Sequence, residues 1–186
     1  YIDTQGHGRI KHAVSISVDS RAAYREVFRC LKQIGHSRIG VLARHEKDWL
    51  FQFWMEEIPQ CGLSLAPGLC EFSAEDVEQA RDVALRMLLA EQRPQAIIAR
   101  TEAQAQGVLR AAQQFGIHVP QELSIVSHGD IFFSRGSEPP LATVSFDYKK
   151  LGETAILALF EMIEDPKKVI EPLVLVEQFF PRGSII

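Results

Sequence analysis

The sequence predicts an α/β fold built on doubly wound parallel sheets, and two features of the chain support this prediction. Short runs rich in Val, Ile and Ala alternate with longer segments whose apolar side chains recur every three or four positions. Strands that alternate with helices in this way are typical of βαβ units, in which a helix joins two parallel strands. The 186 residues are enough for one sizeable core or for two small lobes.

The first strand and helix are expected between residues 13 and 35. The apolar run at 13–18 contains Val and Ile, as a buried strand does. Ser20 can cap the helix that follows, because its hydroxyl can accept a hydrogen bond from a free backbone N–H. Gly35 can end the helix in the left-handed conformation that glycine tolerates. The apolar face of this helix consists of Tyr24, Val27, Phe28 and Leu31.

The same alternation continues to the end of the chain. Further strands are expected at 38–43, 69–72, 95–99, 123–127, 142–146 and near 173–178. Helices are expected over 47–61, after the capping-box sequence at 73–76, after Thr101 and after residue 146. In the last of these helices, Leu151, Ala155, Leu159 and Met162 form an apolar stripe. Residues 129–140 contain two glycines and two prolines and are expected to form a loop.

The charge and the cysteine content argue against several classes of protein. The formal net charge is −4 and Lys and Arg form no run, so the chain offers no electrostatic footprint for nucleic acid. Cys30, Cys61 and Cys70 are odd in number and lack close pairing, which favours free thiols in a reducing cytoplasm over disulfides or a zinc site. There is no stretch of eighteen apolar residues, so no membrane span is expected.

The common catalytic motifs are missing from the sequence. It contains neither a Gly-x-Ser-x-Gly elbow, nor His-Glu-x-x-His, nor a phosphate-binding Gly-x-x-x-x-Gly-Lys-Ser/Thr. The six histidines are scattered, whereas metal ligands recur at helix or turn spacing. We therefore expect no enzyme activity, no metal site and no cofactor.

A set of short segments, in a fixed order, carries a family resemblance. They are Val-Ser-Ile-Ser-Val-Asp at 14–19, Ile-Gly-His-Ser-Arg-Ile-Gly at 34–40, Ala-Gln-Gly at 105–107, Phe-Gly-Ile-His-Val-Pro-Gln-Glu-Leu-Ser-Ile-Val at 115–126, Pro-Pro-Leu-Ala-Thr-Val at 139–144, Leu-Gly-Glu-Thr-Ala at 151–155 and Arg-Gly-Ser at 182–184. At these spacings the chain resembles the effector-binding domain of the lactose/galactose-repressor (LacI/GalR) family of bacterial transcription regulators. The resemblance covers roughly residues 1–186 and begins abruptly, as in an N-terminally truncated domain.

The resemblance implies a periplasmic-binding-protein-like (type I) fold with two lobes. Residues 1–36 and 142–167 would belong to the first lobe, which would be partial. Residues 37–141 and the C-terminal strand segment at 168–186 would form a nearly complete second lobe. The helix-turn-helix with which the family reads DNA would lie upstream of residue 1, so that DNA would be bound only through an element absent from this chain.

Five residues are expected to contact an effector between the lobes. Asp19 ends a predicted strand, and ligands of open α/β sheets bind in the crevice at strand carboxyl ends. Its carboxylate could bind ligand hydroxyls as in the family, or it could cap the next helix. Phe72 could stack on a sugar or base, or pack in the core. Thr101 would hydrogen-bond to the ligand, with Trp49 and Glu102 nearby.

Three polar anchors of the family are changed in this chain. The family motif Arg-x-x-Gly-Phe aligns with Leu-Phe-Gln-Phe-Trp at 50–54, so Leu50 replaces the effector-binding Arg. The Asn-Asp pair becomes Thr101-Glu102, and the Asp that closes a later strand is replaced at 127–129. Each lost charged hydrogen bond weakens binding by roughly 2 kcal/mol. The effector is therefore expected to differ from the family's typical sugars, or to be absent, and Arg44, His45 and Glu102 could supply other contacts.

The resemblance also implies a homodimer formed through the second lobe. The family pairs through the helix that matches 102–115 and the loop before the double proline. Here that loop carries Ile131, Phe132 and Phe133, which a monomer would expose unless the rings folded back under the lobe.

Two functions share this architecture, and fold alone does not separate them. The first is a ligand-sensing, dimerising domain of a cytoplasmic regulator, whose lobes close on an effector. The second is a sugar-binding protein of a transport system. The free cysteines and the segments at 35–39 and 119–126 favour the regulator.

Overall fold

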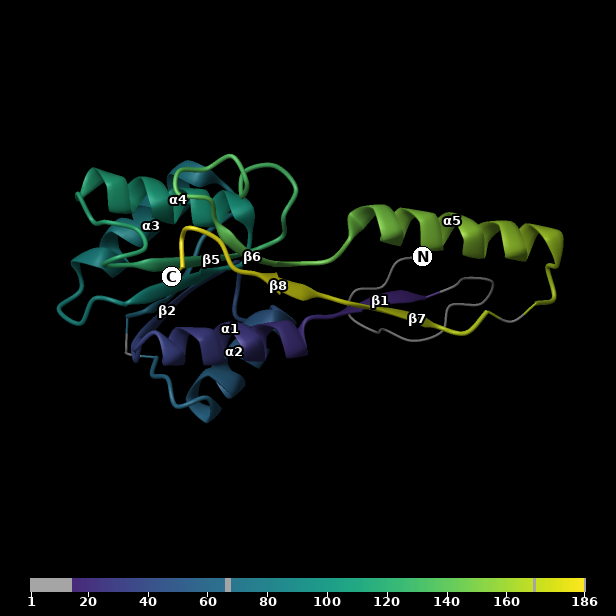
Figure 1. Cartoon of the computed structure of the whole chain (residues 1–186), viewed down its shortest axis with the longest axis horizontal. Helices are drawn as coiled ribbons and strands as arrows, with labels where there is room; N and C mark the ends of the chain where they lie inside the picture. The colour runs from purple at the N-terminus through teal and green to yellow at the C-terminus, as the bar shows by residue number, and fades with distance from the viewer. Residues whose placement is uncertain (1–14, 66–67, 169, 186) are drawn as a thin grey trace.

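A computed structural model describes residues 15–65, 68–168 and 170–185. Over these residues the structure is elongated, with a large sheet and four helices at one end and a small sheet with one helix at the other (Figure 1). Strands and helices alternate in the order that the sequence predicts, from β1 (Ile16–Asp19) to β8 (Gln178–Phe180).

The large sheet has six strands in the order β3-β2-β4-β5-β6-β8. Its strands are β2 (Ile39–Ala43), β3 (Cys70–Phe72), β4 (Ala96–Ala99), β5 (Ser124–His128), β6 (Ala142–Ser145) and β8. The first five are parallel, and β8 runs antiparallel to β6 at the edge. All five residues of β2 are buried, because helices cover both faces of the sheet.

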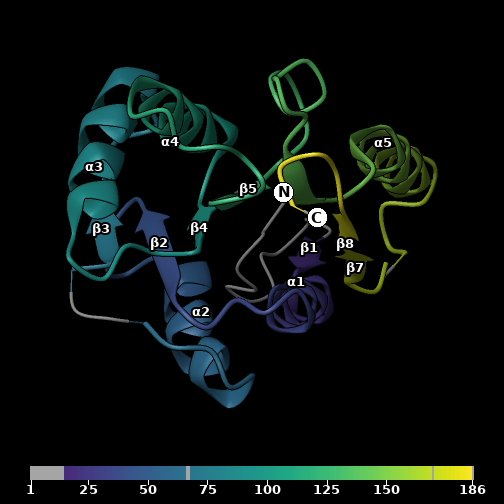
Figure 2. The ribbon, with the colours of Figure 1, turned by 60° about the vertical axis from the view of Figure 1, so that its left-hand side comes forward.

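Two helices pack on each face of this sheet (Figure 2). The pair α1 (Arg21–Gln33) and α2 (Trp49–Gln60) shares a core with Val41 and Ile98. The pair α3 (Val77–Leu89) and α4 (Glu102–Gln114) shares the opposite core with Leu42 and Ile97. Adjacent strand residues thus enter different cores, as the alternation of side chains along a strand requires.

The small sheet contains β1 and β7 (Leu173–Val176), paired in parallel with Ile16 opposite Leu173. Helix α5 (Tyr148–Glu164) packs on it through a modest apolar cluster centred on Ile16 and Ala158. Within the described ranges, three short connections join the two ends: β1 to α1, β6 to α5, and β7 to β8.

Several local predictions are confirmed. Tyr24, Val27, Phe28 and Leu31 are fully buried on α1, and Gly35 has a φ of 92° after its end. The Thr101 hydroxyl accepts a hydrogen bond from the backbone N–H of Gln104 and so caps α4.

Other local predictions need correction. Ser20 makes no side-chain capping bond; the Oδ1 atom of Asp19 accepts from the Arg21 N–H at 3.0 Å instead. Asp76, not Ser73, caps α3, because the helix begins at Val77, and the Ser73 hydroxyl instead accepts a hydrogen bond from Gln104. Leu159 is 57% exposed, since Ala158 takes the inward position on α5.

The structure divides the chain between its two sheets at other positions than the predicted lobe boundaries. Helix α1, placed with 1–36 in the first lobe, packs on the six-stranded sheet. Strand β6, placed with 142–167 in the first lobe, lies in that same sheet. The predicted strand at 173–178 splits at Glu177 into β7 and β8, which belong to different sheets. The part of the predicted strand 13–18 before residue 15 lies outside the described residues.

Candidate functional site

Polar side chains gather where the carboxyl ends of the parallel strands meet the three connections. Asp19 ends β1, Ser20 lies between β1 and α1, Arg100 follows β4, His128 ends β5, and Glu177 separates β7 from β8. The Glu177 N–H donates to the Asp19 carbonyl oxygen at 3.0 Å, which holds two of the connections together. We call these five residues the crossover cluster. It lies at the strand ends where ligands of open α/β sheets bind.

His128 and Glu177 are the most strongly perturbed titratable groups of the crossover cluster. The Tyr24 hydroxyl and the Nδ1 atom of His128 are 3.2 Å apart, and that Nδ1 lies 3.7 Å from a carboxylate oxygen of Glu177. Burial, helped by the charge of Arg100, lowers the pKa of His128 to about 3. Burial raises the pKa of Glu177 to about 7 against the opposing effect of Ser20 and Arg100. Near neutral pH the site therefore holds a neutral imidazole beside a carboxyl group that can carry a proton.

An ion-paired cluster lies next to the crossover cluster. Asp48, only 3% exposed, caps α2 by accepting from the Leu50 N–H, and its Oδ2 atom accepts from Arg44 and Arg100 at 3.2 and 2.9 Å. Burial would raise the pKa of Asp48, but Arg100 and the helix N–H hold it below its usual value. Arg44 also pairs with Glu75. The carboxylate of Asp48 thus fixes both guanidinium groups near the strand ends.

The two aromatic residues expected at the site are both half-buried. Trp49 begins α2 and packs at the margin of the core beneath α1 and α2. Phe72 ends β3 and contacts Phe51 edge to face, with ring centroids 5.2 Å apart. The Phe72 ring packs against Phe51 while the residue keeps partial exposure, and stacking of this ring on a ligand stays a prediction.

Asp19, Thr101 and Glu102 have different surroundings. The side chain of Asp19 is 42% exposed although it also bonds to the start of α1. Thr101 follows Arg100 at the N-terminus of α4. Glu102 is 8% exposed, and its carboxylate accepts hydrogen bonds from the loop that contains Ile131 and Phe132. The structure therefore places Glu102 under this loop and not as a free acceptor beside Asp19.

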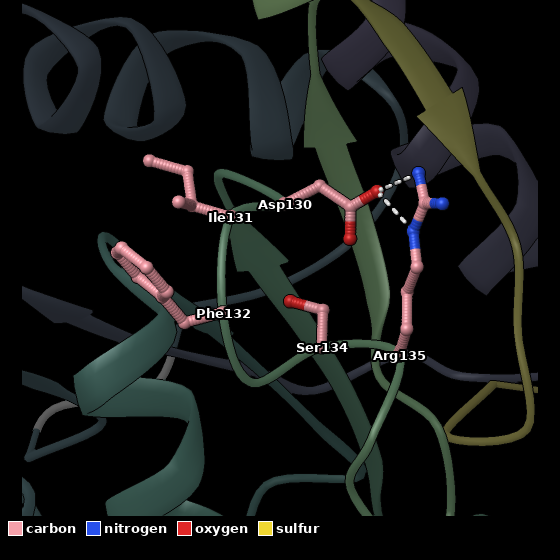
Figure 3. Close-up of a pocket in the computed structure, with 5 residues that line it drawn as sticks. All are labelled: Asp130, Ile131, Phe132, Ser134 and Arg135. Carbon is pink, nitrogen blue, oxygen red and sulfur yellow. Dashed lines mark hydrogen bonds and ion pairs between the residues drawn. The ribbon is translucent and has the colours of Figure 1, made fainter.

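The loop between β5 and β6 projects from the sheet on the side of α3 and α4 (Figures 1 and 2). At its base, Asp130 pairs with Arg182 through two hydrogen bonds of 3.0 and 2.7 Å and also with Arg135. Phe132 is 79% exposed. A cavity of about 320 Å³ lies along the loop, lined by Asp130, Ile131, Phe132, Ser134 and Arg135 (Figure 3).

Sequence reasoning missed the central polar groups of the site. Glu177, together with Gln178, interrupts an apolar run from 173 to 180, and this interruption was its only signal in the sequence. Arg100 and Asp48 each directly precede a residue that was singled out, Thr101 and Trp49. Leu50, at the position of the family's Arg, is fully buried, so no polar anchor exists there.

The part of the chain that the structure describes shows no group of three metal-binding side chains. Over the same residues, no helix is long and apolar enough to cross a bilayer.

The chain matches the family model of the periplasmic binding protein-like domain over residues 28–185. It belongs to this family. The ribose operon repressor of Haemophilus influenzae is 29% identical over 161 residues, which is 84% of this chain and 48% of the relative. The HTH-type transcriptional repressor CytR of Escherichia coli K12 is 25% identical over 154 residues, 81% of this chain and 45% of the relative. The chain thus spans about half the length of the curated relatives it matches.

A solved structure shares the fold of this family member. The LacI family regulator of Arthrobacter sp. FB24, in complex with lactose, superposes with a TM-score of 0.87 at 20% identity, covering 100% of this chain and 70% of that one. The predicted fold class and the predicted resemblance to LacI-type effector-binding domains are confirmed.

Proposed function

We propose that this family member is the effector-sensing and self-associating part of a cytoplasmic transcription regulator. Its effector, a sugar or a related small molecule, would bind between a first lobe around β1, β7 and α5 and a second lobe around the six-stranded sheet. The observation that carries this proposal is the crossover cluster, a set of polar groups at and beside the connections between the two sheets, of which Ser20 and Glu177 are buried. The relatives named above are repressors, which favours a regulator over a transport protein.

Within this cleft each residue would have a distinct role. Asp19 would accept hydrogen bonds from ligand hydroxyls, because its side chain is partly exposed at the carboxyl end of β1. The free side of Phe72 would stack on a ring, and Thr101 and Trp49 would line the wall. Closure of the lobes would bend the connections that contain Ser20 and Glu177, so ligand binding would be sensed by the crossover cluster.

A thermal-shift screen of sugars, polyols and nucleosides tests the site assignment. Asp19→Ala and Phe72→Ala are each expected to weaken binding of a hit by about tenfold or more in isothermal titration. Asp82→Ala and Phe160→Ala are matched controls, since both side chains are exposed on α3 and α5. A hit whose affinity is unchanged by both site variants would show that the site lies elsewhere.

The apolar loop supports the proposal of a homodimer. Ile131, Phe132 and Phe133 are 55%, 79% and 44% exposed, so in the single chain the rings do not fold back under the sheet. Light scattering at tens of micromolar should give a dimer that becomes a monomer when Phe132→Ser is combined with Phe133→Ser. Leu89→Ser, which alters an apolar residue with 68% exposure on α3, should leave the dimer intact. A wild-type monomer would rule out this interface.

We further propose that the chain catalyses no reaction, because its named relatives are repressors and its sequence has none of the common catalytic motifs. Assays with glycoside and phosphoester substrates should show no turnover. Reproducible turnover that Asp19→Ala or Glu102→Ala abolishes would contradict this.

A further inference from the structure

The carboxylate of Glu102 accepts hydrogen bonds from consecutive residues of the loop between β5 and β6. The backbone N–H of Ile131 donates to Oε2 at 3.0 Å, and that of Phe132 donates to both oxygens at 3.2 and 3.3 Å. The N–H groups of Phe133 and Ser134 donate to Oε1 at 3.3 and 3.2 Å. The Ser134 hydroxyl adds the shortest bond, 2.6 Å. Four consecutive residues of the loop thus direct their donors at one side chain.

The backbone N–H groups of this loop surround the Glu102 carboxylate as they would surround a bound anion. Successive backbone N–H groups that converge form a concave nest for negative charge, and hydrogen bonds to an ionised group are about twice as strong as neutral ones. Burial of Glu102 would raise its pKa, but the bonds from Ser134, Ile131 and Phe132 hold it below the usual value. The carboxylate therefore stays charged at neutral pH and needs no cation to balance it.

The loop has few other ties near its apolar residues. The ion pairs of Asp130 hold the start of the loop, the Ser137 N–H donates to the Phe133 carbonyl, and the Leu141 N–H donates to the Ser134 carbonyl where the loop returns. Between these points the side chains of Ile131, Phe132 and Phe133 lie largely in solvent. Figure 3 shows Ile131 and Phe132 turned away from the Asp130–Arg135 pair. Their packing against the molecule is therefore only partial.

We propose that Glu102 is a positioning residue that holds the Ile131–Ser134 stretch in the conformation that associates with a second copy of the chain. Its effect on association rests on the proposed function, whereas its hold on the loop does not. Glu102 is also the first residue of α4, directly after Thr101. One helix N-terminus therefore connects the proposed ligand cleft with the proposed dimer surface.

Amide hydrogen exchange of residues 131–134 tests the hold on the loop. The measurement is made in the Phe132→Ser, Phe133→Ser background, so that association does not protect the amides. Glu102→Gln removes the charge at constant size and places an N–H₂ donor against N–H donors. Exchange at these amides is expected to accelerate by roughly tenfold or more. Ser134→Ala removes only the hydrogen bond from the hydroxyl and should give a smaller acceleration. This variant tests the same contact if Glu102→Gln does not fold.

A matched control separates this effect from a general loss of charge. Glu122 also binds a backbone N–H, that of His118 at 3.0 Å, on a different part of the surface. Glu122→Gln should leave exchange at 131–134 unchanged. Equal exchange rates in the Glu102→Gln and Glu122→Gln proteins would overturn the proposal.

Light scattering of Glu102→Gln, with Phe132 and Phe133 intact, tests the link to association. The expected result is a dimer dissociation constant raised at least tenfold over wild type. If Glu102→Gln dimerises with unchanged affinity while its loop amides exchange rapidly, the link between the loop conformation and association is overturned. The dimer proposal itself would stay in place. A wild-type monomer would overturn the dimer and the link, whereas the exchange result would still decide the hold on the loop.

Discussion

Replacing Glu177 with Gln should change how the stability of the fold depends on pH. The carboxyl group is 3% exposed, and burial raises its pKa from 4.5 to about 7. Between these values the folded chain keeps a proton that the unfolded chain has released. The stability contributed by Glu177 is therefore fully present below pH 4.5 and is lost as the pH rises towards 7.

His128 acts in the opposite direction. Its pKa falls from 6.5 to about 3, so its contribution to stability is present above pH 6.5 and is lost as the pH falls towards 3. Each group changes the free energy of unfolding by about 1.4 kcal/mol per pH unit inside its window. Between pH 4.5 and 6.5 the two slopes cancel, so wild type should show no net dependence from this pair.

The difference between variant and wild type isolates Glu177, because other groups contribute equally to both curves. From pH 4.5 to 7 the free energy of unfolding of Glu177→Gln should rise relative to wild type by roughly 3 kcal/mol in total. Urea titrations followed by the fluorescence of the fully buried Trp54 measure it. Glu91→Gln, at an exposed position, is the control. A difference curve that stays flat within about 0.5 kcal/mol would refute the reasoning.

Three further predictions concern the packing and the charge of the chain. A Cβ atom at Gly107 would lie 2.6 Å from that of Ala80, so Gly107→Ala should destabilise the fold by about 1–3 kcal/mol. Gly152 has open space around it, so Gly152→Ala should stabilise α5 by up to about 1 kcal/mol. Denaturant titrations in which Gly107→Ala is the more stable variant would be inconsistent with the α3–α4 packing. Ser184→Ala should cost about 1–3 kcal/mol, because the buried hydroxyl bonds to both β5 and β6, and an unchanged midpoint would argue against those bonds. Gel shifts at physiological salt should show no sequence-selective DNA binding by these 186 residues, whose net charge is −4, and a selective shift would contradict this expectation.

Local patterns predicted most elements of the fold because they depend on neighbouring residues. The three- and four-residue spacing of Tyr24, Val27, Phe28 and Leu31 identified the buried face of α1. It could not identify which sheet that face would meet, and the family-based assignment to the first lobe differs from the packing observed. On α5 the predicted stripe is wrong only at Leu159, because Ala158 is also apolar and takes the inward position, whereas Leu151, Ala155 and Met162 pack as predicted.

The site was less predictable, because its contacts join distant segments. The rule about strand carboxyl ends, together with the family resemblance, pointed to Asp19 and Thr101, and their contact with an effector stays a prediction. Glu102 appeared as a cleft residue for the same reason, yet its partners lie 29 to 32 positions later in the chain. Glu177 and His128 approach each other only because β7 and β8 belong to different sheets. No periodicity in the sequence carries that information.

A residue-resolved NMR titration with a sugar, polyol or nucleoside hit tests the central claim most directly. The account predicts that the largest chemical-shift changes fall at the carboxyl ends of the strands, on Asp19, Ser20, Trp49, Phe72 and Thr101. Changes confined to the cavity along residues 130–135, with the crossover cluster unaffected, would contradict it.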